Sequence, residues 1–277
     1  MTTTGPTTTG STAVDVPRRR PLTALATAEF RQFCRNKTLV TMGTVFPIGI
    51  PLATFFLARR DADVTTTLAA TTLELFAYAA LLFVQYYSVL SMVTTRRGEG
   101  VLKRLRTGEA ADWQILTAPA VPGILLTAAG TAIVAAIVYG FGAPAPVNPI
   151  LVAVALIAGV IVFSVLALAT SAVTKNAEAA QITSLPVMVL ATIGLESIRS
   201  ILPDGLAGVA GWTPFAAVSD LISLGTTGTS ATASSSDAAL DFAGTFGEIA
   251  QPVATLVLWS VLAFALTSTS FRWDDRG

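Results

Sequence analysis

The residues most suited to a chemical role in this chain are polar residues within apolar segments, and they form two rows. At about 100° per residue, each row follows one face of a helix. Carboxylates in apolar surroundings are costly, so they normally face a bundle interior or a water-filled path. The rows either line a pathway or subunit seam, or join helices through hydrogen bonds. Their members are Glu74, Tyr78, Gln85, Ser88, Thr192 and Glu196.

No motif in the sequence predicts a catalytic centre or a metal site. The chain has no histidine, which removes the commonest general base and the commonest metal ligand. Its lone cysteine, Cys34, excludes a disulfide within one chain. The phosphate-binding loop, the zinc-protease motif and the nucleophile elbow are all absent. We therefore expect no catalytic residue, no metal and no cofactor on this chain.

A basic segment in the middle of the chain offers a different kind of chemistry, the docking of a partner. Residues 96–113 (RRGEGVLKRLRTGEAADW) hold five of the 17 Lys and Arg residues and lie between two long apolar stretches. Five basic residues beside a span often serve only as topology anchors. Topology alone does not account for the interleaved leucines, Gly100 or Trp113, which favour a docking element.

The composition predicts an all-α membrane protein. The chain is 53% hydrophobic and 12% charged, whereas soluble domains are about 25% charged. A membrane span needs about 20 mostly apolar residues. Six segments of that kind are predicted as spans: Thr38–Ala58, Leu68–Thr95, Leu116–Phe141, Pro149–Thr174, Ala177–Ile198 and Ile249–Ser270.

The distribution of positive charge predicts the orientation of these spans. Lys and Arg are enriched on the cytosolic side of membrane proteins. With the N-terminus inside, all of the 17 basic residues except Arg59, Arg60 and Arg199 fall on the inner side. We therefore predict a multi-pass protein of the plasma membrane with both termini in the cytosol.

The flanking segments complete the predicted organisation. Residues 1–20 form a Thr- and Gly-rich cytosolic tail, expected to be disordered, and residues 38–277 form the six-span domain. Residues 21–37 predict an amphipathic helix on the inner membrane surface, with Phe30 and Phe33 on its apolar arc and Arg35 opposite. Glu29 falls within that apolar arc, which suggests a buried contact.

The last outer connection, residues 199–248, is unusually long. Its first half is apolar but interrupted by Gly and Pro, so it is too broken for a full span. This pattern predicts one or two short helices at, or dipping into, the outer membrane face. The second half is low in complexity and is expected to be mobile.

The central loop also carries a pattern that resembles a known family. It reads Arg97-x-Glu99-Gly100-Val101-Leu102-Lys103-Arg104-Leu105-Arg106, followed by Trp113-Gln114-Ile115-Leu116. This is similar to the cytosolic loop of type-2 ABC transporter permeases, which commonly reads R-E-x-G-T-L-K-R-L-R. The layout looks most like drug-resistance permeases of the daunorubicin-exporter kind. One departure is that Glu99 directly precedes Gly100.

The resemblance implies a function, partners and a role for the loop. Such permeases pair with a second copy or a paralogue, and two copies of a separate ATPase subunit bind ATP and Mg. The chain itself would be a transport subunit and no enzyme, serving multidrug efflux or antibiotic resistance. The loop would dock the ATPase through Glu99, Gly100, Leu102, Lys103, Arg104, Leu105 and Arg106. The interfacial helix with Phe30, Phe33 and Arg35 would complete that surface, and no nucleic acid is expected as a partner.

Several functions remain open at this stage. The leading hypothesis is ATP-driven export of a hydrophobic or amphiphilic small molecule, such as a drug, antibiotic or lipid. Within the family, export of a polysaccharide or lipid-linked glycan is the alternative, and the 8% aromatic content weighs weakly against it. An ion-coupled secondary transporter should show inverted repeats and charges in mid-span, and neither is evident. A membrane assembly factor that transports nothing is the remaining alternative.

Overall fold

The computed structural model describes residues 21–273 apart from 36, 61, 109, 231–237 and 272. The predicted tail, residues 1–20, and residues 231–237 of the low-complexity part of the outer connection lie outside these residues. All regular elements within the described ranges are helices, with no β-strand among them. The predicted all-α class is thereby confirmed.

Four continuous stretches of helix are long and apolar enough to cross a membrane, counted over the described part of the chain. Thr66–Gly98 joins α3 (Thr66–Ala79), the π-helical η1 (Ala80–Tyr87) and α4 (Ser88–Gly98). Asp112–Gly140 joins α6 (Asp112–Thr117), the 3₁₀ turn η2 (Ala118–Ala120) and α7 (Val121–Gly140). The other two are α8 (Pro149–Val173) and α14 (Ala250–Ser270). They coincide with the second, third, fourth and sixth predicted spans, and the chain is a multi-pass membrane protein.

The first and fifth predicted spans differ from these four. The first corresponds to α2 (Lys37–Ala58), of which Gly43–Ala58 is a shorter apolar segment. The fifth is not one helix but three, α9 (Ala179–Thr183), α10 (Leu185–Ile193) and α11 (Glu196–Arg199). This corrects the expectation of a single span there.

Local chemistry explains why the fifth span is divided. Pro186 stands in the first turn of α10, where its missing N–H is tolerated but an unbroken helix would lose a hydrogen bond. At the other end, a Cβ on Gly194 would lie 2.6 Å from the backbone nitrogen of Ala216. Leu195 then adopts an extended backbone and separates α10 from α11.

The apolar half of the outer connection folds into α12 (Asp204–Ala210) and α13 (Pro214–Thr227), bent by 92° at the break between them. Together they form either a broken span or a re-entrant loop. One or two short helices at, or dipping into, the outer membrane face were predicted here, and α13 is a helix that enters the bundle. It packs against α3, α8 and α14, and nearly all its residues are buried. The short turn η3 (Gly244–Gly247) precedes α14.

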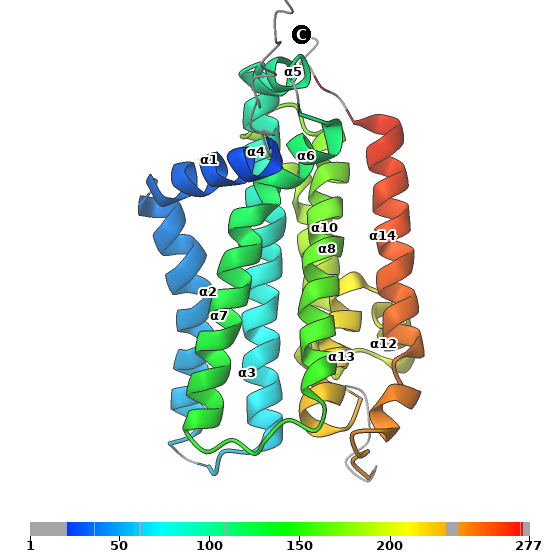
Figure 1. Cartoon of the computed structure of the whole chain (residues 1–277). Helices are drawn as coiled ribbons and strands as arrows, with labels where there is room; N and C mark the ends of the chain where they lie inside the picture. The colour runs from blue at the N-terminus through cyan, green and yellow to red at the C-terminus, as the bar shows by residue number, and fades with distance from the viewer. Residues whose placement is uncertain are drawn as a thin grey trace, which may run out of the picture.

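Figure 1 shows the long helices side by side, with short helices, α6 among them, grouped at one end of the bundle. There α1 (Pro21–Arg35) lies across the bundle, and α5 (Val101–Arg106) caps the end of α4. The last turn of α14 points to the same end. We call this the α5 end. Exposed apolar side chains such as Ile157, Val261 and Phe264 cover the outside of the bundle, as lipid contact requires.

Candidate functional site

The α5 helix is held against the bundle by its leucines. Gly100 forms the turn between α4 and α5 with φ +67°, a left-handed conformation that favours glycine. Leu102 is completely buried in the hydrophobic core, and Leu105 is half-buried against it. Leu102 is therefore not available to a partner's groove, contrary to the sequence-based expectation. It fixes α5 to its own chain instead.

The basic side chains of α5 face outward. Lys103 and Arg104 are exposed, and the Arg104 guanidinium donates to the backbone carbonyl of Glu99 at 3.1 Å. Arg106 also has partners within the chain. It forms an ion pair with Asp112 at 3.4 Å, and its guanidinium lies 4.7 Å from the centre of the Trp273 ring. Lys103, Arg104 and Arg106 are thus all exposed cations of the predicted docking segment.

A buried ion pair joins α1 to the end of α4. Both guanidinium nitrogens of Arg96 donate to the carboxylate of Glu29, and the exposed fraction of Glu29 is only 2%. Arg96 also donates to the Gln32 side chain at 3.3 Å. The acid that interrupts the apolar arc of α1 therefore has a partner, as its position suggested. On the same helix Phe33 is buried, whereas Phe30 and Arg35 are exposed.

A second arginine ties α4 to α8. The buried Arg97 guanidinium donates to the backbone carbonyls of Ser171, at 2.7 Å, and Thr174 at the C-terminal end of α8. The Ser171 carbonyl also accepts from the Thr174 backbone N–H at 3.3 Å, and the helix dipole favours a cation at this end of α8. No sequence pattern indicated this contact, because Arg97 looked like one more cation of a basic loop. The end of α4 is thus fixed to both α1 and α8.

The comparisons with known proteins decide the family. The family model described as ABC-2 type transporter matches residues 20–194, which is more than half of the chain and includes α1, α4, α5 and α6. The chain belongs to the ABC-2 type transporter family. It is a membrane-spanning permease subunit of an ABC transporter. No curated protein and no solved structure matches the chain.

The two polar rows of this ABC-2 permease meet across the bundle. The Tyr78 hydroxyl and the Thr192 hydroxyl lie 2.8 Å apart. One carboxylate oxygen of Glu74 accepts from the backbone N–H of Glu196 at 2.8 Å and from the Ser219 hydroxyl at 2.6 Å. α3 and the divided fifth segment are therefore joined by direct hydrogen bonds.

The remaining two members of the rows lie further along the same helix. The Gln85 side-chain amide donates to the Ser164 hydroxyl of α8 at 2.7 Å. The Ser88 hydroxyl donates to the Phe83 carbonyl of its own helix, at 3.4 Å. These hydrogen bonds, made by Glu74, Tyr78 and Gln85, connect their own helix to the divided fifth segment, to α13 and to α8. This supports a role in joining helices. A role in lining a pathway or a subunit seam stays a prediction.

Two residues of the interior polar cluster were not singled out from the sequence. Arg199, which the sequence marked only as one of three basic residues off the inner side, donates to Asp220 at 2.7 Å and to Ser219 at 3.3 Å. Only 2% of the Arg199 side chain is exposed. A charged residue inside the apolar stretch PFAAVSDLISLG is the signal that could have marked Asp220. It was missed because that stretch was assigned to the membrane face.

Proposed function

We propose that this permease moves a hydrophobic or amphiphilic small molecule outward, driven by ATP hydrolysis on a separate ATPase subunit that docks on residues 96–113. Two permeases, as a homodimer or with a paralogue, would pair with two ATPase copies. ATP and Mg would bind to the ATPase. The family assignment supports an ABC transporter subunit, and the docking site and the cargo class are our proposal.

One observation carries the docking proposal: α5 presents cations outward while it is anchored inward. Lys103 and Arg104 are exposed on one side of α5, and Leu102 is buried on the other. A helix transmits force to the membrane spans only if it cannot slide on them. The exposed cations of α5 can attract an acidic surface on a partner. Because Leu102 fixes α5 to the bundle, a movement of the partner would then move the spans.

The contacts of α4 supply a path for that movement. α4 continues directly into η1 and α3, so displacing its end acts on a helix that runs from Thr66 to Gly98. The Glu29–Arg96 pair connects α4 to α1, and Arg97 connects α4 to the end of α8. We infer that docking at α5 would move these three helices together.

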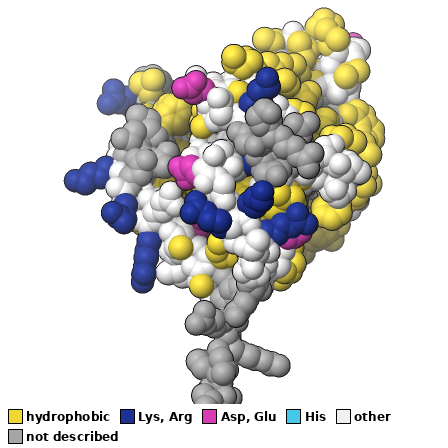
Figure 2. All heavy atoms as spheres, turned by 90° about the horizontal axis from the view of Figure 1, so that it is seen from above, with side chains coloured by type: hydrophobic (Ala, Val, Ile, Leu, Met, Phe, Trp, Pro, Cys, Tyr) yellow, Lys and Arg dark blue, Asp and Glu magenta, His cyan; other side chains and the backbone are white. Residues whose placement is uncertain are grey.

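The charge of the α5 end supports the proposed orientation. Figure 2 shows Lys and Arg side chains spread over this end of the molecule, with apolar side chains gathered along one flank. Enrichment of basic residues marks the cytosolic side. We therefore propose that the α5 end, α1 and both termini are cytosolic. Among the described residues, the exposed cations there are Arg31, Arg35, Lys37, Lys103, Arg104, Arg106 and Lys175.

A charge reversal tests the docking proposal. The double variant Lys103→Glu and Arg104→Glu is expected to reduce co-purification of the co-expressed ATPase at least about tenfold, because opposite charges across an interface become like charges. Arg60→Glu, an exposed reversal at the other end of the bundle, is the matched control and should leave co-purification unchanged. Normal co-purification of the double variant, with normal ATP hydrolysis in lipid, would show that the ATPase does not dock at these residues.

A further inference from the structure

The junction between α1 and α2 carries three exposed cations that no contact described so far involves. Arg31 and Arg35 lie in the second half of α1, and Lys37 is the first residue of α2. At about 100° per residue, each of the two arginines lies about 160° around the helix from Phe33, which is buried against the bundle. Both arginines therefore point away from the core of the permease. We call Arg31, Arg35 and Lys37 the α1 cations.

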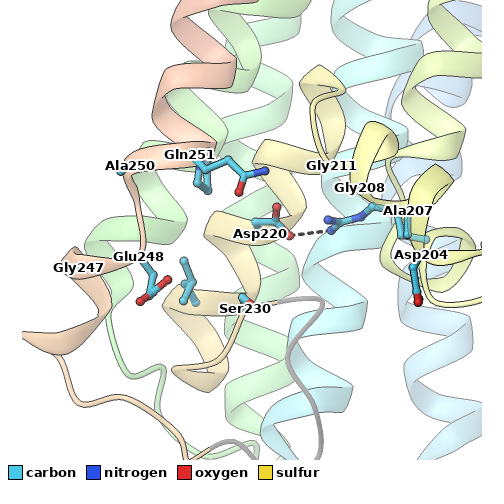
Figure 3. Close-up of a pocket in the computed structure, with 13 residues that line it drawn as sticks. Asp204, Ala207, Gly208, Gly211, Asp220, Ser230, Gly247, Glu248, Ala250 and Gln251 are labelled. Atoms are coloured by element: carbon cyan, nitrogen blue, oxygen red, sulfur yellow. Dashed lines mark hydrogen bonds and ion pairs between the residues drawn. The ribbon is translucent and has the colours of Figure 1, made fainter.

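The α1 cations have no partner within the part of the chain that the structure describes, since no hydrogen bond or ion pair there involves their side chains. Other arginines are paired. Arg106 meets Asp112. Arg199 meets Asp220 at the wall of a cavity between α12, α13 and the start of α14, as the dashed contact in Figure 3 shows. The one acid on α1 and α2, Glu29, is already used in a buried ion pair. The charge of the α1 cations is thus left for a partner outside the chain.

The same junction lies at the level where membrane headgroups are expected. Phe30 is exposed on α1, and Val45 and Phe46 are exposed on α2, as on a surface that faces hydrocarbon. Val45 lies about 12 Å along the helix from Lys37. Figure 1 shows α1 across the ends of the long helices, with α5 further out from them. The α1 cations therefore stand at the edge of the hydrocarbon region, where lipid phosphates lie.

The occupant of this surface has to match both its charge and its apolar side chains. An acidic protein surface would match the cations but would leave Phe30, Val45 and Phe46 to be covered by something else. An anionic phospholipid matches both, because its phosphate meets cations while its acyl chains meet the apolar side chains. A zwitterionic lipid carries its own cation, so the net charge of the surface attracts it less.

We propose that the α1 cations bind the headgroups of anionic phospholipids, with the acyl chains against Phe30 and the first turns of α2. The sequence-based expectation placed Phe30 and Arg35 on the ATPase surface, and this proposal assigns both to lipid instead. Lipid binding at α1 requires neither ATP, nor cargo, nor an ATPase. It goes beyond the proposed function and does not depend on it.

The lone cysteine of the chain supplies a local reporter. Cys34 is exposed and precedes Arg35 on α1, so the full chain can carry one fluorophore there without any other substitution. The labelled permease would be placed, without ATPase, in phosphatidylcholine nanodiscs that contain a small fraction of spin-labelled lipid. That lipid is either phosphatidylglycerol or phosphatidylcholine with the same spin-labelled acyl chain. It quenches the fluorophore only when it lies beside α1.

Two double variants at the same end of the bundle separate a local site from general positive charge. Arg31→Gln with Arg35→Gln removes two of the three α1 cations. Lys103→Gln with Arg104→Gln removes two cations from α5 and is the matched control. All four side chains are exposed, so neither double variant changes the packing of the core.

In the parent permease, the anionic lipid should quench about threefold more strongly than phosphatidylcholine at equal mole fraction, because each basic residue near the headgroups favours an anionic lipid. The α1 double variant keeps only Lys37, so this ratio should fall below about 1.5. The α5 double variant should keep the ratio of the parent. Raising the salt to about 1 M, where the Debye length is about 3 Å, should remove the preference.

Equal quenching by the two lipids in the parent would overturn the proposal, as would the same ratio in both double variants. Loss of quenching by both lipids in the α1 double variant would show that the cations hold α1 against any membrane, which also contradicts selection of anionic lipid. If the α1 double variant instead lost ATPase co-purification and kept the lipid ratio, its arginines would belong to the ATPase surface. Because the nanodiscs contain no ATPase, a failed docking test on Lys103 and Arg104 leaves this measurement unaffected.

Discussion

The α5 end and the opposite half of this permease differ in what accompanies their buried arginines. At the α5 end, Arg96 and Arg97 tie α4 to its neighbours, and Lys103 and Arg104 are exposed on the adjoining helix. In the other half, Arg199 on α11 is buried and paired with Asp220 of α13. Arginine therefore joins helices at both places, and exposed cations accompany it at the first. Docking is our proposal for those exposed cations alone.

Of the changes that test this comparison, breaking the Arg199–Asp220 pair should have the largest effect on stability. Asp220→Ala leaves the Arg199 charge buried without its ion-pair partner, at an expected cost of about 3–5 kcal/mol in stability. Purified yield and thermal unfolding of the full chain in detergent measure it. The double variant Arg199→Met and Asp220→Leu removes both charges and should lose much less. Equal stability of the single variant and the parent would mean that the pair does not hold α11 to α13.

Removing Arg97 should have the next largest effect. Arg97→Ala deprives the carbonyls at the end of α8 of charged donors, which is expected to cost about 2 kcal/mol. Thermal unfolding in detergent again provides the measurement. Arg35→Ala, an exposed arginine at the same end, is the control and should unfold like the parent. If Arg97→Ala and Arg35→Ala lose the same stability, Arg97 acts only through its charge and not through its hydrogen bonds to α8.

Variants of the Glu29–Arg96 pair test how firmly the α5 end holds α1. Glu29→Gln weakens a charged hydrogen bond and is expected to cost about 1 kcal/mol, seen as faster hydrogen exchange of the α1 backbone amides. The combined Glu29→Arg and Arg96→Glu variant restores opposite charges and should recover part of the protection. Unchanged exchange in Glu29→Gln would indicate that Phe33 alone holds α1 in place.

The smallest expected effect concerns the turn before α5. Gly100→Ala forces an L-residue into positive φ and should cost about 1 kcal/mol, which tilts α5 and lowers ATPase co-purification. Gly98→Ala is the matched control, because it has open space around its Cβ and is not among the glycines with positive φ. A larger loss in Gly98→Ala than in Gly100→Ala would contradict the assigned role of the turn.

Much of this architecture follows from sequence patterns, and the exceptions have physical causes. Long apolar runs predicted α8 and α14 nearly to their bounds, because a helix that faces lipid must be apolar along its whole length. The same hydropathy reasoning joined α9, α10 and α11 into one span, since it does not register a backbone break at Leu195. The family, by contrast, was recognisable from the loop alone.

The candidate site was only partly predictable for a related reason. α5 has six residues, too few for periodicity to show which side faces the bundle, so Leu102 was assigned to a partner. The arc of α1 is 15 residues long and did show that Glu29 faces inward. Asp220 and the cavity beside it depend on how α12, α13 and α14 meet in space, which no local pattern encodes.

The π-helical stretch η1 has a consequence for how this permease tolerates changes in length. Each of its wider turns takes up more residues than an α-turn, so η1 resembles an α-helix into which a residue has been inserted. Deleting one residue there would turn α4 by about 100° relative to α3. Arg96 and Arg97 would then face away from α1 and α8. The number of residues between Glu74 and Arg96 therefore fixes how α4 is rotated relative to α3. That rotation decides whether Arg96 and Arg97 meet their partners on α1 and α8.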